Sequence, residues 1–150
     1  MSKKNMGFFG VLSFFLAGMS SSFGATLSLP ASAHGDSYSC SYSFSYQYLY
    51  TSAGTCSTTF PIRLPAGTYV SSVKVYYLDD SSTYAVSASL VRQYLPTGGL
   101  DSPSYVSSSG SSSSVRYLLL PGFPVISPFG YYISIASGAG LRIYGVEINY

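Results

Sequence analysis

Residues 60–92 decide the fold, and they read FPIRLPAGTYVSSVKVYYLDDSSTYAVSASLVR. Proline fixes φ and glycine tolerates positive φ, so Pro65-Ala66-Gly67 predicts a turn after a first strand. Residues 69–78 are rich in β-branched and aromatic residues, which favour a second strand. The side chains of Asp79-Asp80-Ser81-Ser82 can bond their own backbone and turn the chain again. We therefore expect three strands joined by two tight turns, in an antiparallel meander.

Alternation of side chains predicts which faces of this meander are buried. Within the second strand, Val73, Val75 and Tyr77 occupy alternate positions on one face. In the third strand one face carries Tyr84, Val86, Ala88 and Leu90, and the other carries Ser87 and Ser89. A period of two with one apolar face is typical of a half-buried strand.

The second half of the chain predicts further strands at residues 115–120, 131–136 and 141–150. Residues 100–114 are mostly serine and glycine, and we expect a mobile loop there. Pro121, Pro124 and Pro128 exclude a central strand, so their segment should follow a sheet edge or cross between sheets. Gly145 predicts a bulge or a close backbone approach.

No helical periodicity appears after the first 33 residues, and turn signals recur at short spacing. The fold class expected is therefore all-β. We predict a single antiparallel β-sandwich of jelly-roll type, with about seven or eight strands.

Residues 1–33 have the organisation of a secretory signal peptide. Lys3 and Lys4 precede an apolar run of 13 residues, 7–19, which is too short to span a membrane. Small residues favour cleavage after Gly24 or after Ala33. We expect a β-sandwich domain at residues 34–150. We expect this domain to be secreted and located outside the cell, on the cell surface or in the periplasm.

Removal of the signal peptide changes the charge. Without Lys3 and Lys4, the five remaining basic residues balance the five acidic ones. No basic patch is left to attract nucleic acid, and a domain near zero net charge tends to associate. We expect no nucleic-acid partner and a tendency to form homo-oligomers.

Cys40 and Cys56 are the two cysteines of the chain, and export predicts a disulfide between them. Their loop of 17 residues would contribute about 3 kcal/mol. Residues 38–50 alternate regularly between aromatic and serine side chains, but one straight strand would hold the cysteines roughly 30 Å apart. Either the strand doubles back near Gln47, or the cysteines meet through another pairing. We favour the first alternative, a break in the strand near Gln47.

Catalytic groups are scarce. His34 is the single histidine, so a copper site lacks its second histidine and a Ser-His-Asp triad depends on this residue alone. The acidic residues are scattered rather than paired across a cleft. Asp79 and Asp80 could bind calcium through hard oxygen ligands, although aspartate also favours turns for its own backbone bonds. We predict no enzyme activity, no metal site beyond this calcium candidate and no cofactor.

Tyrosines carry the functional signal. All sixteen follow the signal peptide, and tryptophan is absent. A tyrosine ring can pack on a sugar or a protein surface while its hydroxyl remains hydrogen-bonded to water. Tyrosine is, however, also common on half-buried strand faces for structural reasons alone. The candidate ligand contacts are the tyrosines that follow Cys40 along its predicted strand face: Tyr42, Tyr46, Tyr48 and Tyr50.

Four short motifs carry a resemblance to known proteins. They are Leu64-Pro65 with Gly67, Tyr76-Tyr77 with Asp79, Leu90 with Arg92, and Tyr144-Gly145-Val146. In these the chain resembles a loosely defined group of secreted bacterial β-sandwich domains with no assigned function. The resemblance covers roughly half of residues 34–150. It implies a fold and no catalytic residues.

The function expected is that of an exported, non-enzymatic binding or structural module. Its partner would be a surface polysaccharide, a protein or a second copy of itself. The alternative is a small eight-stranded outer-membrane β-barrel, because Tyr144, Val146, Ile148 and Tyr150 alternate as in the last strand of such barrels. A membrane partner follows only from this alternative.

Overall fold

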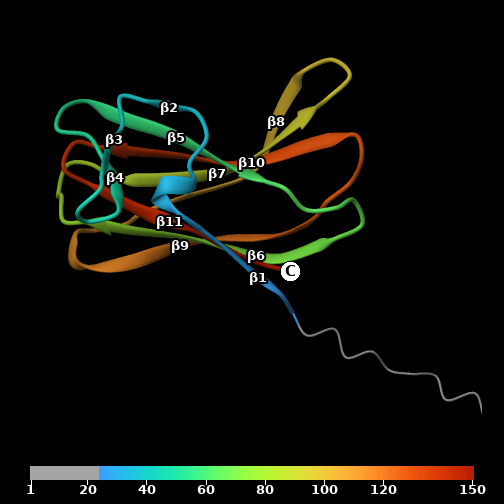
Figure 1. Ribbon diagram of the computed structural model, residues 1–150. Helices are drawn as coiled ribbons and strands as arrows, with labels where there is room; N and C mark the ends of the chain where they lie inside the picture. The colour runs from blue at the N-terminus through green and yellow to red at the C-terminus, as the bar shows by residue number, and fades with distance from the viewer. Residues whose placement is uncertain (1–23) are drawn as a thin grey trace, which may run out of the picture.

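The computed structural model describes residues 24–150 and consists of two antiparallel sheets packed face to face (Figure 1). Sheet A has the order β3-β4-β11-β6-β9, with β1 also paired to β11, and sheet B has the order β2-β5-β10-β7-β8. The strands are β1 (Thr26–Pro30), β2 (Ser37–Tyr38), β3 (Ser41–Ser43), β4 (Tyr48–Tyr50), β5 (Thr55–Ile62), β6 (Tyr69–Asp79), β7 (Val86–Tyr94), β8 (Gly99–Ser107), β9 (Ser112–Pro124), β10 (Phe129–Gly138) and β11 (Arg142–Asn149). The all-β antiparallel sandwich is confirmed. Seven of these strands have eight or more residues, and the short strands β1–β4 add to the number expected.

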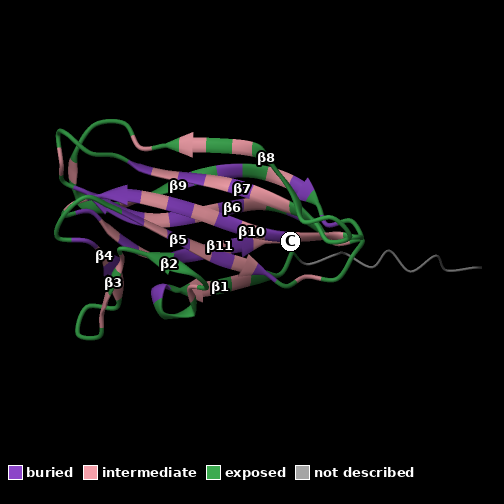
Figure 2. Ribbon diagram, turned by 90° about the horizontal axis from the view of Figure 1, so that it is seen from above, coloured by how far each residue is buried: buried purple, intermediate pink, exposed green. Residues whose placement is uncertain are grey.

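The core lies between the sheets and includes the apolar faces that the alternation predicted at residues 73–77 and 86–90. Val73 and Val75 of β6 are fully buried, as are Ile133 and Ile135 of β10 (Figure 2). Val86, Ala88 and Leu90 of β7 are also buried, whereas Tyr84 is exposed ahead of the strand. Each of these valine, leucine and isoleucine side chains contributes on the order of 1.5–3 kcal/mol through its removal from water.

The strands of residues 60–92 are confirmed, but the meander is wrong. β5 pairs with β2 and β10, β6 pairs with β9 and β11, and β7 pairs with β8 and β10. The two turns therefore carry the chain from sheet B to sheet A and back. Such crossing between two sheets is typical of a jelly roll, whereas a hairpin keeps successive strands side by side in one sheet. Alternation defines the buried face of a strand, and it does not define the strand's neighbours.

Residues 100–114 were expected to be a mobile loop, and this expectation is wrong. Most of them belong to β8 and to the start of β9. β8 pairs with β7 and forms the edge of sheet B, where Pro103 lies at a register irregularity between Asp101 and Ser104, a position that tolerates proline. Hydrogen bonds to β7 order a serine-rich segment whose composition alone predicts disorder.

β9 confirms the reading of the proline-rich segment. It is the edge strand of sheet A, and it includes Pro121 and Pro124. Gly145 is likewise confirmed as an irregular position, because the register of β11 against β6 shifts between Ile143 and Gly145.

The sandwich begins before residue 34. β1 pairs with β11 from Thr26 opposite Asn149 to Pro30 opposite Gly145, and a 3₁₀ turn (Ala31–Ala33) follows it. Ala31 is fully buried. A domain at residues 34–150 would lack this strand. The predicted signal peptide lies, as far as residue 23, outside the described residues.

The described strands form two separate sheets and not one closed barrel. The alternative of a small outer-membrane barrel is therefore wrong. The strand that suggested a barrel is β11, and its apolar side chains face the core between the sheets.

Within residues 24–150, no helix has the length and apolar character needed to cross a membrane.

Candidate functional site

The break expected near Gln47 is confirmed. β3 and β4 pair as a hairpin with Tyr42 opposite Leu49, and the Gln47 N–H donates to the carbonyl of Ser43 at 2.7 Å. Gln47 adopts a φ of 55°, which the tight reversal requires. The chain thereby returns toward β5, and Cys40 and Cys56 form the predicted disulfide with their Cα atoms 4.7 Å apart.

Because the chain reverses here, the aromatic side chains of residues 38–50 do not share one face. Leu49 points into the core and is 1% exposed, so Tyr48 and Tyr50 on either side of it point outward. Phe44 and Tyr46 lie in the turn and are 87% and 70% exposed. The hairpin projects from the body of the sandwich (Figure 2).

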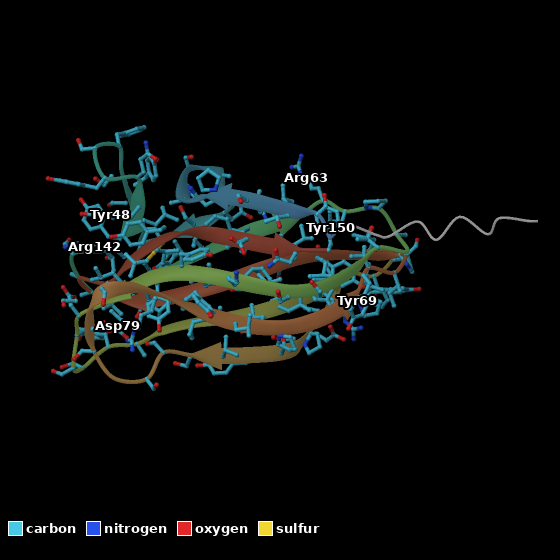
Figure 3. All side chains as sticks on the ribbon, turned by 90° about the horizontal axis from the view of Figure 1, so that it is seen from below. Tyr48, Arg63, Tyr69, Asp79, Arg142 and Tyr150 are labelled. Atoms are coloured by element: carbon cyan, nitrogen blue, oxygen red, sulfur yellow. A yellow bond between two sulfur atoms is a disulfide. The ribbon has the colours of Figure 1, made fainter. Side chains whose placement is uncertain are left out.

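Two of the four predicted tyrosines line a hollow. Tyr46 and Tyr48 face Arg142 and Tyr144 of β11 around a space of about 620 Å³. Figure 3 shows Tyr48 and Arg142 side by side at the end of the sandwich where the hairpin projects. We call this space the tyrosine hollow. Of the other candidates, Tyr42 packs edge-on against Phe44, and Tyr50 packs edge-on against Tyr48.

The sequence analysis missed Arg142 and Tyr144. Both alternate with buried Ile143 on β11, so their outward direction could be inferred from the sequence. Their neighbours could not, because only the pairing of Arg142 with Tyr50 and of Ile143 with Leu49 brings β4 beside β11.

Aromatic contacts hold the hollow in shape. The rings of Tyr46 and Tyr48 are stacked at 5.8 Å and 13°, and the ring of Tyr144 meets Tyr48 edge-on at 5.7 Å. The guanidinium carbon of Arg142 lies 5.2 Å from the centroid of the Tyr48 ring. Rings fixed in this way lose little further freedom when a ligand binds, so their contacts contribute to affinity.

Further tyrosines extend this surface across sheet A. Tyr144 and Tyr76 both line a smaller hollow of about 210 Å³. Tyr76 of β6 in turn packs against Tyr117 of β9 at 6.1 Å. The outer face of sheet A therefore carries tyrosines on β4, β11, β6 and β9.

A polar cluster lies beside the aromatic one. Lys74 donates to Glu147 at 2.8 Å, and the Tyr76 hydroxyl donates to the other carboxylate oxygen at 3.1 Å. Asn149 also donates to Glu147, at 3.3 Å. These donors, with Lys74 first, lower the pKa of Glu147, and the bond to Glu147 raises the pKa of Lys74. Burial, followed by the bond to Glu147, raises the pKa of Tyr76. Charged and neutral hydrogen-bonding groups thus adjoin the tyrosines.

Asp79 and Asp80, the calcium candidates, differ in their surroundings. Asp79 is 2% exposed, and its carboxylate accepts hydrogen bonds from the Ser81 N–H and the Ser108 hydroxyl. Asp80 is exposed in the following turn. Within residues 24–150, no group of three metal-binding side chains is present. Through its bond with Ser108, Asp79 anchors the turn to the β8–β9 connection. Calcium binding by Asp79 and Asp80 stays a prediction.

A second hollow lies on the outer face of sheet B and has a different character. It measures about 460 Å³, and its polar side chains come from Asp36, Thr59, Gln93 and Tyr132. Tyr132 is the single aromatic residue that lines it. The tyrosine hollow is the stronger candidate because three rings converge on it.

Comparison with known proteins identifies similar structures rather than a family. No family model matches the chain, and no curated protein sequence matches it. The C-terminal CBM6 of LamC, a marine laminarinase from Zobellia galactanivorans, superposes with a TM-score of 0.58 at 14% identity, over 84% of this chain and 100% of that one. The carbohydrate-binding module CBM6cm-2 from Cellvibrio mixtus lichenase 5A, in complex with cellotriose, gives 0.52 at 12% identity, over 84% and 96%.

A third match is the isomalto-dextranase of Arthrobacter globiformis T6 complexed with panose. Its TM-score is 0.54 at 11% identity, over 82% of this chain and 23% of that one. At these identities the likeness shows the fold alone. The chain has the β-sandwich fold of the two carbohydrate-binding modules described above.

Proposed function

We propose that the chain is a carbohydrate-binding module that holds a polysaccharide on the outer face of sheet A. The observation that carries this proposal is the tyrosine hollow, in which Tyr46, Tyr48 and Tyr144 converge on a space of about 620 Å³.

The chemistry of the hollow suits a sugar. The C–H face of a pyranose ring packs against an aromatic ring, and the phenolic hydroxyl at the ring's edge can bond to sugar hydroxyls. Tyr144 and Tyr76 continue this surface toward Glu147, Lys74 and Asn149, which offer both donors and acceptors. A chain of several sugars could therefore contact rings and polar groups in turn.

The fold supports the proposal. CBM6cm-2, which has the same fold, is described in complex with cellotriose. The disulfide between Cys40 and Cys56 is typical of an oxidising compartment, where an exported module would meet its polysaccharide.

Binding without catalysis is part of the proposal. Asp101 pairs with Arg92, Glu147 pairs with Lys74, and Asp79 is hydrogen-bonded to Ser108. Three of the five acidic side chains are thus engaged in contacts that stabilise the sandwich, which supports a binding role for the outer face.

The test measures polysaccharide affinity by electrophoresis in gels that contain a panel of soluble polysaccharides. Tyr48→Ala and Tyr144→Ala should each weaken binding about tenfold or more, which corresponds to ~1.4 kcal/mol, because each removes a ring from the hollow. Tyr105→Ala is the matched control, since Tyr105 is 65% exposed on β8 in sheet B.

Two results would contradict the proposal. One is a wild-type protein that no polysaccharide of the panel retards. The other is a Tyr105→Ala variant that loses as much affinity as Tyr48→Ala while thermal melts show that both remain folded.

A further inference from the structure

Arg142 is the basic group of the tyrosine hollow, and the structure gives it no acidic partner. Two ion pairs occur within residues 24–150, Lys74 with Glu147 and Arg92 with Asp101. Arg142 belongs to neither, and its contact in the structure is the face of the Tyr48 ring. Arg142 is half-buried, with its guanidinium against the Tyr48 ring, and within residues 24–150 no hydrogen bond joins that guanidinium to a protein acceptor.

None of the other residues that line the tyrosine hollow carries a charge that could neutralise Arg142. Lys74 and Glu147, on the same outer face, neutralise each other at 2.8 Å. Asp79 follows Leu78, the residue of β6 that lies opposite Arg142, but its carboxylate is buried and accepts from Ser81 and Ser108. The tyrosine hollow thus carries one net positive charge.

A stacked arginine is well suited to recognise an anion. Its planar guanidinium presents several N–H donors in one plane, which match the two oxygens of a carboxylate or a sulfate. Contact with Tyr48 fixes that plane, so less side-chain freedom is lost when an anion binds. Nearby aromatic rings also exclude water, which strengthens the attraction.

We propose that the polysaccharide bound in the tyrosine hollow is anionic. Arg142 contacts a carboxylate or a sulfate ester on a sugar unit whose ring packs against Tyr48 and Tyr144. This inference rests on the proposed function, and it adds the chemical class of the ligand.

The test uses two ligand pairs in which charge differs on one backbone. Polygalacturonate is compared with its methyl ester, and dextran sulfate is compared with dextran. Wild-type protein, Arg142→Gln and Arg63→Gln are titrated with all four by calorimetry. Arg63 is the control because it is exposed in the connection between β5 and β6, away from Arg142 (Figure 3).

The wild-type protein should bind the charged member of at least one pair about tenfold more tightly than its neutral partner. Preference for polygalacturonate identifies a carboxylate ligand, and preference for dextran sulfate identifies a sulfate ester. Arg142→Gln should abolish the preference, Arg63→Gln should retain it, and added salt should weaken it.

Some results would overturn the inference and leave the proposed function intact. These are equal affinities within both pairs, a preference that survives Arg142→Gln, or a preference that Arg63→Gln removes to the same extent. By contrast, a wild-type protein that binds neither these ligands nor any polysaccharide of the wider panel would overturn the proposed function as well.

Discussion

Gly145 lies in β11, where that strand is flanked by the backbones of β1 and β6. It is opposite Pro30 of β1 on one side of β11 and opposite Tyr76 of β6 on the other. Its φ is 149°, and a Cβ atom placed on it would lie 2.4 Å from the carbonyl oxygen of Leu29. This approach allows β1 to pair along β11 and places Tyr144, the preceding residue, on the outer face.

We predict that Gly145→Ala destabilises the protein by about 1–3 kcal/mol, because the methyl group meets rigid backbone and the φ disfavours a side chain. Unfolding in urea measures the change. Gly140→Ala is the control, since Gly140 also has a positive φ, 84°, but has open space around its Cβ position. If both variants lose the same stability, backbone conformation alone explains the effect and the contact with Leu29 contributes nothing.

At the scale of elements, the β3–β4 hairpin connects the disulfide to the candidate site. It supplies Tyr46 and Tyr48 to the hollow, and the Cys40–Cys56 bond ties its first strand to β5. The hairpin pairs with β11 at two residues only, Arg142 and Ile143. Its position therefore depends on the disulfide as well as on hydrogen bonds.

Replacement of both cysteines by serine should lower the free energy of unfolding by about 3 kcal/mol, since a loop of this length is no longer closed in the unfolded chain. Affinity for polysaccharide should fall at the same time, because Tyr46 and Tyr48 become less fixed. Urea unfolding and gel retardation measure the two effects. An unchanged affinity in a folded double variant would show that the hairpin keeps its place without the bond.

For the whole molecule, the question is where the sandwich begins. β1 covers part of one side of β11, and its Leu27 and Leu29 pack against the core. Without this strand, five residues of β11 would lose their backbone partners on that side. Export with cleavage after Gly24 would retain β1, whereas cleavage after Ala33 would remove it.

We predict that the exported protein begins at Ala25, which intact-mass measurement can show. We also expect residues 34–150 to be less stable than residues 25–150 by about 3 kcal/mol, the order of magnitude for two partly buried leucines. Urea unfolding of the two purified forms compares them. Equal stabilities would mean that β1 is dispensable and that either cleavage site is compatible with the fold.

Features that depend on neighbouring residues were predictable from the sequence, and features that depend on distant segments were not. Val73, Val75 and Tyr77 were placed correctly because burial follows directly from their alternation. The loop predicted for residues 100–114 is wrong because the order of residues 100–107 depends on β7, a separate segment of the chain. In the candidate site, Tyr46 and Tyr48 could be proposed from the sequence. Arg142 and Tyr144 could not be associated with them, because nothing local indicates that β11 lies beside β4.

The sequence by itself determined the long strands other than β8, the buried faces of residues 73–77 and 86–90, the turn near Gln47 and the disulfide, since each depends on neighbouring residues or on the reach of a short loop. Only the tertiary structure decided which strands pair, and with that the division of residues 60–92 between two sheets. The physical reason is that backbone hydrogen bonds are the same for every strand, so pairing is selected by how well whole faces pack together. That selection brought Arg142 to the ring of Tyr48 and so assembled the site.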